Sequence, residues 1–503
     1  MDISHWISHW ADWQEERVAV HFEGQDISYG EMDRRVSRLA NMLAGQLGVG
    51  RGDRVAHLGY NSPELLELLF ACARLGAMLV PLNWRLAPPE HVWILQNCEP
   101  RAVLAEADFF SHLSSIRHEV PDLPFVAYGK NDGWLSYHEL LAGAGDDAGG
   151  GGLDDPVTVV YTSGTTGRPK GTLLSQEALL YNAVNAAAAH DITRDDHGLT
   201  VLPMFHVGGM NIHTTPSIHA GATTTIKARF DPADTLAAIA ERKPSIFLTV
   251  PAMTLALAAH PDWLTTDISS LRLVGVGSSA VPEAVLRCFM DRGVPATQIY
   301  GLTESAPMAI CLPIADVETK IGSCGKPALH TMARIVDDNG ELVASGQAGE
   351  IMLAGKNLFR EYWRDDVGTA EAYSDGWFHT GDIGHQDEDG YYYVDERKKD
   401  VVISGGENIY PAELENVLAD CADLAEAAVI GRPDERWGEI PVACVVRQAD
   451  SEIGGAEILA LFEGRLARFK HPRGVIFMDA LPRNAMGKVE KFTLRAQLDD
   501  VEN

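Results

Sequence analysis

Residues 161 to 171 have the composition of a phosphate-binding loop. The segment Tyr161-Thr-Ser-Gly-Thr-Thr-Gly-Arg-Pro-Lys-Gly171 directly follows the strand-like run Val157-Thr-Val-Val-Tyr161. Its glycines let backbone N–H groups turn toward an anion, while its hydroxyl groups and Lys170 add donors and a positive charge. These groups are suited to binding a polyphosphate. The alternative interpretation is that the segment is a plain flexible loop. A Walker A loop is excluded, because Lys170 is followed by Gly171 and not by Ser or Thr.

A second glycine-rich turn, Gly275-Val-Gly-Ser-Ser-Ala280, raises the alternative of a dinucleotide site. Such a site needs an acidic residue at the end of the next strand, about 20 residues further on. The next strand-like segment, Thr297-Gln-Ile-Tyr300, ends instead in Gly301-Leu-Thr-Glu304. A nicotinamide-dependent dehydrogenase is therefore disfavoured, and a turn that lets a planar ring approach the backbone fits these residues as well.

Several motifs together point to one family. They are the 161–171 loop, Tyr300-Gly-Leu-Thr-Glu304, Thr380-Gly-Asp382, Arg397 with Ser404-Gly-Gly-Glu-Asn408, and Pro482-Arg-Asn-Ala-Met-Gly-Lys488, in that order. With them the chain resembles the acyl- and aryl-CoA synthetase branch of the adenylate-forming (ANL) enzymes. The resemblance runs from about Ile27 to Arg495 and is specific because the motifs occur together and in order.

The resemblance implies an AMP-forming ligase that uses ATP, Mg²⁺ and coenzyme A. A carboxylic acid and ATP would give acyl-AMP and pyrophosphate, and the CoA thiol would then displace AMP. Both steps bring negative charges together, so the catalyst must supply positive charge and positioning. A non-catalytic ATP-binding regulator is the alternative outside the family, and Lys488 and Glu304 argue against it. A luciferase-like oxygenase and a peptide-synthetase module are the disfavoured alternatives within it.

The resemblance also implies roles for individual residues. Thr303 would meet the α-phosphate, Glu304 and Thr166 would hold Mg²⁺, and Lys488 would neutralise the reacting carboxylate and phosphate. Asp382 would bind the ribose hydroxyls with help from Arg397. The full nucleotide-binding set adds residues of the loop, the adenine turn and the 298–301 strand end: Thr162, Ser163, Gly164, Thr165, Gly167, Lys170, Ser278, Ser279, Ala280, Gln298, Ile299, Tyr300 and Gly301.

Two positions depart from the family pattern. Gln176 stands where many members carry histidine, and Ser279-Ala280 replaces the common Ala-Pro. Size and polarity are roughly kept at both sites, so we expect at most a modest effect on nucleotide affinity.

The segment Met204-Phe-His-Val-Gly-Gly-Met210 corresponds to the family's acyl-pocket segment. His206 would lie beside the reacting carboxylate, although a satisfied core histidine is the alternative. No Lys or Arg falls in this segment to pair a second carboxylate, since Lys227 and Arg229 lie well beyond it, and an unpaired buried charge is costly. We therefore expect an apolar monocarboxylate, either a medium- or long-chain fatty acid or, alternatively, an aryl acid of the cinnamate, ferulate or benzoate type. The substrate set is His206, Val207, Gly208, Gly209, Met210 and Gly301.

Alternating helical and strand-like patterns indicate an α/β fold with largely parallel sheets. Tyr29–Leu47 and Leu65–Leu75 have helical spacing, whereas the runs starting at Arg54 and Ala77 are strand-like. The resemblance implies a large N-terminal domain of α/β subdomains with mixed sheets and a small mobile α+β C-terminal domain. We expect these to be residues 1–396 and 400–503, joined by a hinge at 397–399. Lys399 would be the hinge residue, and Ser404, Gly405 and Gly406 would border the pantetheine tunnel.

Composition limits the partners and the compartment. The 503 residues carry 41 Lys+Arg against 71 Asp+Glu, a formal net charge of −30. Such a surface repels phosphate backbones, so nucleic acid is not an expected partner. The seven cysteines lack metal-site spacing and favour reduced thiols, and no apolar run reaches the about 18 residues of a membrane span. We expect a cytoplasmic enzyme with small-molecule substrates and leave a homodimer open.

Overall fold

The computed structural model describes residues 1–131, 133–145, 148–162, 169–277, 281–397, 400–404, 407–409, 411–434, 437–463, 465–466, 468–483 and 488–500. By contacts the chain divides into two compact units. The first comprises Met1–Ala333 and Leu353–Phe378, and the second comprises Arg334–Met352 and His379–Asn503. The described helices include none that is long and apolar enough to cross a membrane.

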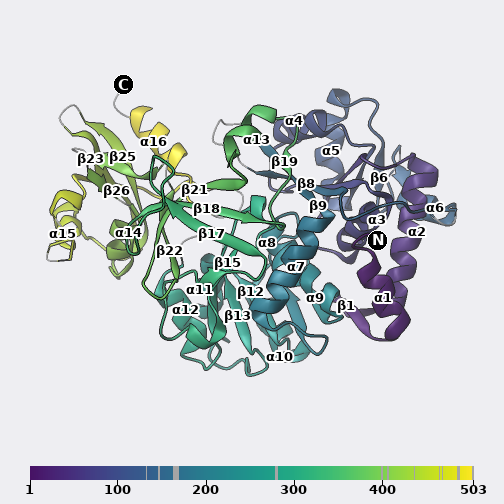
Figure 1. The fold of residues 1–503 in the computed structure, drawn as a ribbon, viewed down its shortest axis with the longest axis horizontal. Coiled ribbons are helices and arrows are strands. Elements are labelled where there is room, and N and C mark those ends of the chain that lie inside the picture. The colour runs from purple at the N-terminus through teal and green to yellow at the C-terminus, as the bar shows by residue number, and fades with distance from the viewer. Residues whose placement is uncertain are drawn as a thin grey trace. The chain divides into compact units, whose positions relative to one another are not determined.

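A nine-stranded sheet forms much of the first unit (Figure 1). Its six central strands, β14 to β1 in the order below, are parallel, and antiparallel strands flank them at both edges. In spatial order they are β16 (Lys326–Pro327), β15 (Ile310–Cys311), β14 (Ala296–Tyr300), β13 (Leu273–Val276), β12 (Ile246–Thr249), β10 (His197–Thr200), β11 (Thr223–Ile226), β1 (Val18–Phe22) and β2 (Gln25–Ser28).

Helices cover both faces of this sheet. Side chains alternate between the faces along each strand, so Phe247 and Val274 pack on one side while Ile246 and Leu248 pack on the other. The first side is covered by α10 (Pro232–Arg242), α11 (Pro251–Ala258) and α12 (Glu283–Met290). The second is covered by α7 (Gln176–His190) and the turn η3 (Met210–Thr214), beside α8 (Val207–Gly209) and α9 (Thr215–Ala220).

An eight-stranded sheet forms the rest of the first unit's framework. Five parallel pairings run from β8 to β7, and β8, β9 and β19 are joined antiparallel. The order is β19 (Glu361–Tyr362), β9 (Lys170–Ser175), β8 (Pro156–Thr162), β4 (Met78–Pro81), β3 (Arg54–Leu58), β5 (Ala102–Ala105), β6 (Phe125–Ala127) and β7 (Leu135–Ser136). Its helices are α1 (His5–Trp13), α2 (Tyr29–Leu47), α3 (Pro63–Leu75), α4 (Pro88–Cys98), α5 (Phe110–Ile116), α6 (Tyr137–Ala142) and α13 (Asp366–Ala372).

Local sequence explains the ends of the longest helices. Ser28 accepts a hydrogen bond from the Glu31 N–H at the start of α2, and Ser62 does the same for the Leu65 N–H at the start of α3. Gly48 and Gly76 follow these helices with φ of 64° and 68°, a conformation that favours glycine. The helical spacing predicted for Tyr29–Leu47 and Leu65–Leu75 is thereby confirmed.

The second unit has its own small sheet, which runs β24 (Glu407–Ile409), β23 (Val402–Ser404), β26 (Gly438–Arg447) and β25 (Leu424–Asp434), with β27 (Gly474–Phe477) beside β26. Its helices are α14 (Pro411–Ala419), α15 (Gly455–Ala460) and α16 (Lys491–Asp500).

A further sheet runs β17 (Thr331–Val336), β18 (Gly349–Gly355), β21 (Trp377–Gln386) and β20 (Tyr373–Ser374), and β22 (Tyr392–Arg397) pairs with β21. Mixed sheets and a smaller C-terminal part confirm the predicted α/β fold class.

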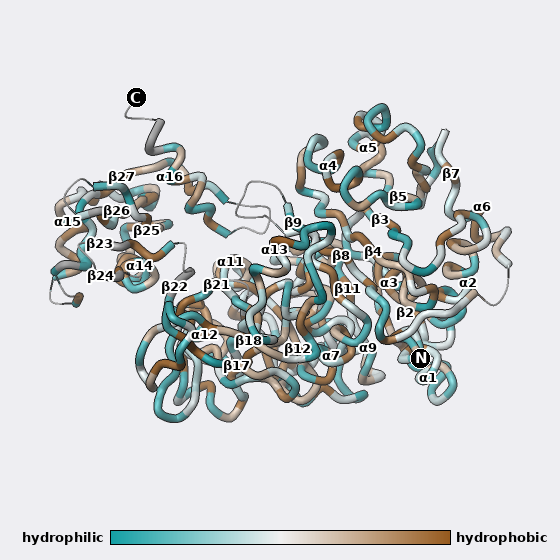
Figure 2. Tube along the Cα trace, turned by 45° about the horizontal axis from the view of Figure 1, so that its top comes forward, coloured by the Kyte–Doolittle hydropathy of each residue, from teal (hydrophilic) through white to brown (hydrophobic). Residues whose placement is uncertain are grey.

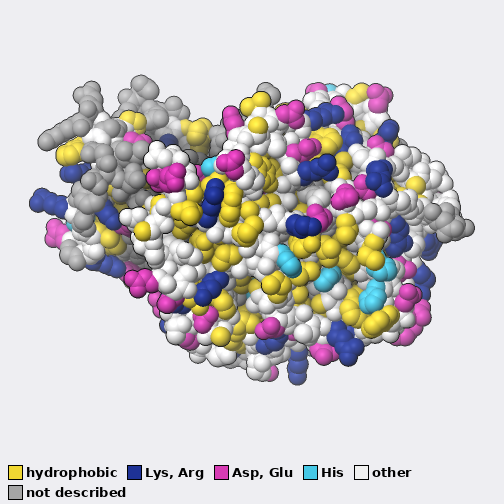
Figure 3. Space-filling view, viewed as in Figure 1, with side chains coloured by type: hydrophobic (Ala, Val, Ile, Leu, Met, Phe, Trp, Pro, Cys, Tyr) yellow, Lys and Arg dark blue, Asp and Glu magenta, His cyan; other side chains and the backbone are white. Residues whose placement is uncertain are grey.

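Hydropathy follows this architecture. Hydrophobic and hydrophilic residues alternate along the chain in both units (Figure 2), and the buried hydrophobic clusters are formed by residues of strands and helices. On the face shown in Figure 3, acidic and basic side chains are interspersed with hydrophobic ones. The described side chains on this face therefore form no large area of a single charge, despite the net charge of −30.

Candidate active site

The predicted phosphate loop joins two paired strands of the eight-stranded sheet. β8 ends at Thr162 and β9 begins at Lys170, and these two residues face each other in the antiparallel register. The loop residues Ser163, Gly164, Thr165, Thr166 and Gly167 lie outside the described residues. Lys170 is held at the strand end, because its Nζ is 3.0 Å from Asp365 Oδ2 and 4.9 Å from the ring centre of Tyr362.

Thr303 and Glu304 follow the carboxyl end of β14, where α/β sheets bind ligands. Both belong to a short 3-10 turn, Thr303–Ser305, and Thr303 is buried. Gly301 before it cannot be replaced without movement, since a Cβ there would lie 1.5 Å from the Pro307 carbonyl oxygen. The Tyr362 hydroxyl donates a hydrogen bond to Glu304 Oε1 at 2.8 Å, and the Phe359 N–H donates to the Glu304 carbonyl at 2.6 Å. The carboxylate and its backbone are thus both fixed by the 359–362 segment.

Buried asparagines hold the chain that follows Glu304. The Asn182 amide on α7 donates to the Asn211 carbonyl at 2.6 Å and accepts from the Met308 N–H at 2.8 Å. Asn357 donates to the Ser305 carbonyl at 2.9 Å. Because each asparagine satisfies buried backbone groups, Asn182 links the predicted acyl segment to the segment that carries Glu304.

The predicted acyl segment forms the turn α8–η3, in which Val207, Gly208, Gly209 and Met210 are buried. The backbone leaves no room for a side chain at Gly209, since a Cβ there would lie 2.3 Å from the Pro203 carbonyl oxygen. His206 caps the turn, with Nδ1 accepting from the Gly208 N–H at 3.1 Å. Burial lowers the pKa of His206 to about 4. The ring is therefore neutral near pH 7.

Residues of β14 belong to the predicted nucleotide-binding set. Gln298 and Ile299 are buried and Tyr300 ends the strand. Among the described residues, Gln298 Oε1 is buried with no hydrogen-bond partner, an acceptor that suits the exocyclic amino group of a base. Ser278, Ser279 and Ala280 lie outside the described residues.

Both predicted ribose-binding residues, Asp382 and Arg397, belong to the second unit. Asp382 is 3% exposed. It lies opposite Arg397 in the β21–β22 register, so the backbones of the two predicted partners are neighbours. The Asp382 N–H donates to Thr380 Oγ1 at 3.1 Å, and Thr380 donates to the Ile351 carbonyl at 2.6 Å. The motif Thr380-Gly-Asp382 lies within strand β21, and these two hydrogen bonds fix the backbone of the residue that carries the carboxylate.

The remaining predicted residues of this unit are only partly described. Lys488 is exposed and precedes Val489, which bridges to Arg483. Ser404 ends β23. Lys399, Gly405 and Gly406 lie outside the described residues, so their predicted roles remain predictions.

The chemistry of the site fits magnesium held mainly through phosphate oxygens. No cluster of three or more His, Cys, Asp or Glu side chains suited to a metal occurs in the described part of the chain. Mg²⁺ commonly takes one or two carboxylates together with substrate phosphates and water. The single carboxylate of Glu304, at the carboxyl edge of the sheet, is consistent with such a site.

Gln176, the departure next to the phosphate loop, has a structural position. It is buried at the start of α7, where its amide accepts from the Ile3 N–H at 2.8 Å and donates to the Ala73 carbonyl at 2.9 Å. These bonds connect the N-terminal segment to α3, so Gln176 has a structural role in the folded chain.

Lys227 and Arg229, set aside above as too distant, line a separate cavity of about 540 Å³ with Trp84 and Arg85. Lys227 pairs with Asp234 at 2.7 Å, and Arg229 lies over the Tyr60 ring at 4.7 Å. None of the predicted site residues lines this cavity.

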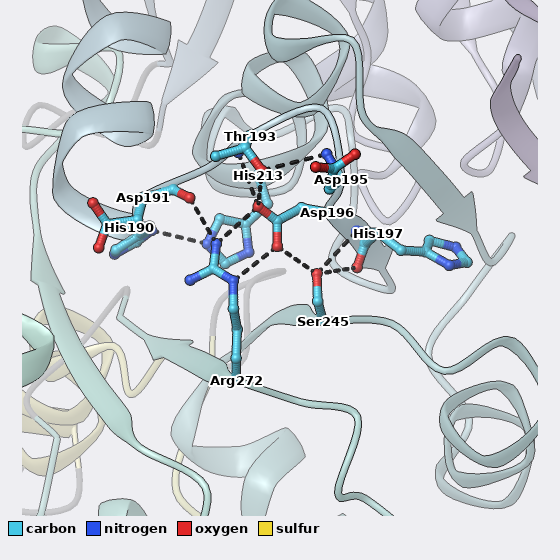
Figure 4. Close-up of polar contacts among 9 residues, drawn as sticks. All are labelled: His190, Asp191, Thr193, Asp195, Asp196, His197, His213, Ser245 and Arg272. Carbon is cyan, nitrogen blue, oxygen red and sulfur yellow. Dashed lines mark hydrogen bonds and ion pairs between the residues drawn. The ribbon is translucent and has the colours of Figure 1, made fainter.

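A buried polar cluster lies at the opposite, amino edge of the nine-stranded sheet (Figure 4). Arg272, just before β13, bonds Asp196 through Nε at 2.8 Å and Nη2 at 2.9 Å, and the Ser245 hydroxyl donates to Asp196 at 2.6 Å. Burial opposes ionisation of Asp196, but the hydrogen bonds from Arg272 and Ser245 outweigh it and lower its pKa. Because this edge carries none of the predicted site residues, we assign the cluster to stability.

Sequence reasoning missed Tyr362, Asp365 and Asn182. The 359–365 segment lies far along the chain from both the loop and Glu304. The β19–β9 pairing brings it to the strand after the loop, and the hydrogen bonds of Phe359 and Tyr362 bring it to Glu304. Its aromatic and acidic residues, Glu361-Tyr-Trp-Arg-Asp-Asp366, were a visible but unspecific signal.

The fold and site together define an adenylate-forming enzyme, with a hydroxyl-rich loop closed by a lysine, a Thr-Glu turn at the carboxyl edge of a parallel sheet, and a separate small α+β unit. The chain belongs to the AMP-binding enzyme family, whose family model matches residues 7–363, and a model of the AMP-binding enzyme C-terminal domain matches residues 413–488. The predicted resemblance is thus confirmed.

Curated relatives match over nearly the whole chain. An indoleacetate–CoA ligase of Aromatoleum aromaticum is 47% identical over 98% of both chains. A feruloyl-CoA synthase of Amycolatopsis is 40% identical over 95% of both, and a long-chain fatty acid–CoA ligase of Mycobacterium tuberculosis is 36% identical over 94% of this chain and 93% of its own. These relatives confirm the predicted AMP-forming acid–thiol ligase class.

Solved structures of similar proteins agree with this family assignment. ATP-bound MatB from Rhodopseudomonas palustris is 32% identical with a TM-score of 0.91 over all of both chains. The o-succinylbenzoate CoA synthetase of Bacillus subtilis, in complex with ATP and magnesium, is 30% identical with a TM-score of 0.88, covering 99% of this chain and 100% of its own. The predicted use of ATP, Mg²⁺ and coenzyme A is confirmed at the level of the family.

Proposed function

We propose that this ligase activates an apolar aromatic monocarboxylic acid, with indole-3-acetate and related arylacetates as the preferred substrates. The observation that carries the proposal is the 47% identity to an indoleacetate–CoA ligase over 98% of both chains. A feruloyl-CoA synthase at 40% identity supports the same chemical class.

The acyl segment supports an uncharged substrate body. Val207 and Met210 are buried and apolar, and the His206 ring is neutral near pH 7 because burial lowers its pKa to about 4. No cation occurs between residues 204 and 210, so a second carboxylate on the acid would be buried without a partner. One carboxylate on an apolar ring fits this segment.

The reaction follows from the proposed roles of the chain's own groups. Lys170 and the hydroxyls of the loop bind the β- and γ-phosphates, while Thr303 meets the α-phosphate. Glu304 holds Mg²⁺, which when bound neutralises phosphate charge. Lys488 adds a positive charge where the carboxylate attacks phosphorus, and Asp382 binds the ribose. The cationic groups and the hydroxyl donors stabilise negative charge in the transition state, whereas Asp382 positions the nucleotide.

In the proposal, the C-terminal domain changes position before the second half-reaction. Residues 397–399 act as the hinge between an N-terminal domain of 1–396 and a C-terminal domain of 400–503. Lys488 serves adenylation in one pose, and Ser404, Gly405 and Gly406 border the pantetheine in the other. A lysine-rich segment suits a hinge, since lysine side chains can be solvated before and after such a movement.

A fatty acid is the second candidate. The long-chain fatty acid–CoA ligase of Mycobacterium tuberculosis, 36% identical over 94% of this chain, supports it. The apolar lining of the acyl segment accepts an alkyl chain as readily as a ring.

The test measures pyrophosphate release with ATP and Mg²⁺ over indole-3-acetate, phenylacetate, ferulate, octanoate, palmitate and malonate, each with and without CoA. We expect the highest kcat/KM on an arylacetate, with turnover stimulated by CoA. A preference for palmitate or octanoate would replace the aryl proposal with the fatty acid one. Release that ignores CoA would indicate another acceptor, and no release on any acid would favour a non-catalytic ATP-binding protein.

A further inference from the structure

One segment reaches both phosphate-facing parts of the first unit. Residues 359–363 pair with β9, because the Arg360 N–H donates to the Leu173 carbonyl at 2.9 Å and the Trp363 N–H donates to the Gly171 carbonyl at 2.7 Å. The same segment bonds the Glu304 backbone through the Phe359 N–H. It therefore bridges the strand that begins at Lys170 and the turn that carries Glu304.

Tyr362 makes both connections with one side chain. Its hydroxyl donates to Glu304 Oε1 at 2.8 Å, and its ring lies 4.9 Å from Lys170 Nζ. Its own N–H donates to Thr369 Oγ1 at 2.9 Å, and the Phe359 ring packs on it at 4.7 Å. A tyrosine hydroxyl is protonated near pH 7 and an ionised carboxylate only accepts, so Tyr362 is the donor in this contact.

The surroundings also restrain Lys170. Asp365 pairs with its Nζ at 3.0 Å while accepting from the Gly368 N–H at 2.8 Å. A Cβ at Gly368 would lie 2.7 Å from Nζ, so the glycine leaves room for the ammonium group. The lysine is confined between a carboxylate, an aromatic ring and a helix start.

We propose that Tyr362 is a positioning residue that sets the magnesium carboxylate Glu304 and the phosphate lysine Lys170 at a fixed spacing. The inference rests on the proposed function for the roles of those two residues. The hydroxyl aims the carboxylate through a charge-assisted hydrogen bond. The ring attracts the ammonium group through a cation–π contact. Nucleotide and metal then meet groups that are already ordered, so less conformational entropy is lost on binding.

Tyr362→Phe separates the two contacts, because it removes the hydroxyl and keeps the ring. Tyr373→Phe is the matched control, since the Tyr373 hydroxyl donates to the Phe359 carbonyl at 2.7 Å in the same aromatic group. We expect Tyr362→Phe to raise the Mg²⁺ concentration for half-maximal pyrophosphate release roughly 10-fold, the effect of one hydrogen bond to a charged group. The KM for the acid should stay within about two-fold. Tyr362→Leu should in addition raise the Kd for ATP.

Calorimetric titration of ATP with Mg²⁺ or Mn²⁺ into the full chain, without any acid, gives a readout besides activity. A double-mutant cycle with Glu304→Gln should show that Tyr362→Phe has little further effect once the carboxylate is gone. Equal metal shifts in Tyr362→Phe and Tyr373→Phe, or additive effects in the cycle, would overturn the proposal. If Tyr362→Phe fails to fold, Tyr362→Leu, which also lacks the donor, takes its place in the cycle. Wild-type protein that binds no ATP would instead refute the proposed function.

Discussion

The Gly208 N–H donates a hydrogen bond to Nδ1 of His206 at 3.1 Å. A neutral imidazole carries one proton, so a ring that accepts at Nδ1 must donate at Nε2. Burial lowers the pKa of His206 to about 4, which keeps the ring neutral near pH 7. The backbone of the acyl turn thus sets the tautomer, and in the proposed site His206 would be an uncharged donor for a carboxylate oxygen of the acid.

His206→Phe should raise the KM of the acid about 10-fold, since it keeps the ring but removes the hydrogen bond to a charged group. In the wild type, His206 should impose no pH dependence on that KM between pH 6 and 8, because a pKa of about 4 lies well below this range. Initial-rate kinetics across this pH range checks both statements. His206→Gln retains a donor and should recover much of the loss. A wild-type KM that falls as pH drops through 6.5 would indicate a charged imidazole and contradict this assignment.

Lys488→Ala should reduce acyl-adenylate formation at least about 100-fold, by analogy with the loss of one well-placed electrostatic group. Conversion of preformed acyl-adenylate by CoA should be spared, because that step does not use Lys488 in the proposal. Rapid-quench measurement of each half-reaction separates the two. Lys491→Ala is the matched control: this lysine, three residues further on, pairs with Glu415 at 2.9 Å and should leave adenylation intact. Near-normal adenylation by Lys488→Ala would exclude the catalytic role.

Sequence patterns predicted the contiguous parts of the molecule well. The helix over Tyr29–Leu47 and the strand before the phosphate loop follow from hydrophobic periodicity and from Ser and Gly at the ends. The contacts of Tyr362 could not be predicted, because they depend on an edge pairing between β19 and β9, almost 200 residues apart. Periodicity records which face of an element is buried, but not which distant element covers it. Asn182 escaped notice for the same reason, since a polar residue on a helix resembles a solvated one until its partners are known.

The Asp196–Arg272 pair offers a test of stability away from the site. Asp196 is 6% exposed and Arg272 is one-third exposed, so removing one partner leaves a largely buried group without its bonds. Arg272→Met should lower the free energy of unfolding by about 3 kcal/mol, measured by urea denaturation of the first unit's transition. Arg287, whose partners Glu283 and Glu318 are both exposed, is the control, and Arg287→Met should cost clearly less than Arg272→Met because surface ion pairs contribute little. Equal losses in the two variants would show that the cluster is not a specific support of the sheet.

Glu67 should make stability depend on pH. This α3 residue is 1% exposed, and its carboxylate lies 3.1 Å from Arg35 Nε on α2. Burial raises its pKa from 4.5 to about 8, although Arg35 works in the opposite direction. Between these values the folded state binds more protons at this site than the unfolded state, so stability falls as pH rises from about 4.5 to about 8. The slope contributed by one such group is at most about 1.4 kcal/mol per pH unit.

Glu67→Gln should therefore flatten the pH profile of the free energy of unfolding over this range, because the amide cannot ionise and resembles the protonated acid in shape. Glu64→Gln is the matched control, since Glu64 contacts the same Arg35 at 3.5 Å but is about one-third exposed. That variant should keep the wild-type slope. Denaturant melts at pH 5, 6, 7 and 8 decide the matter. If Glu67→Gln keeps the wild-type slope, Glu67 is ionised in the folded protein throughout and the attraction of Arg35 outweighs the cost of burial.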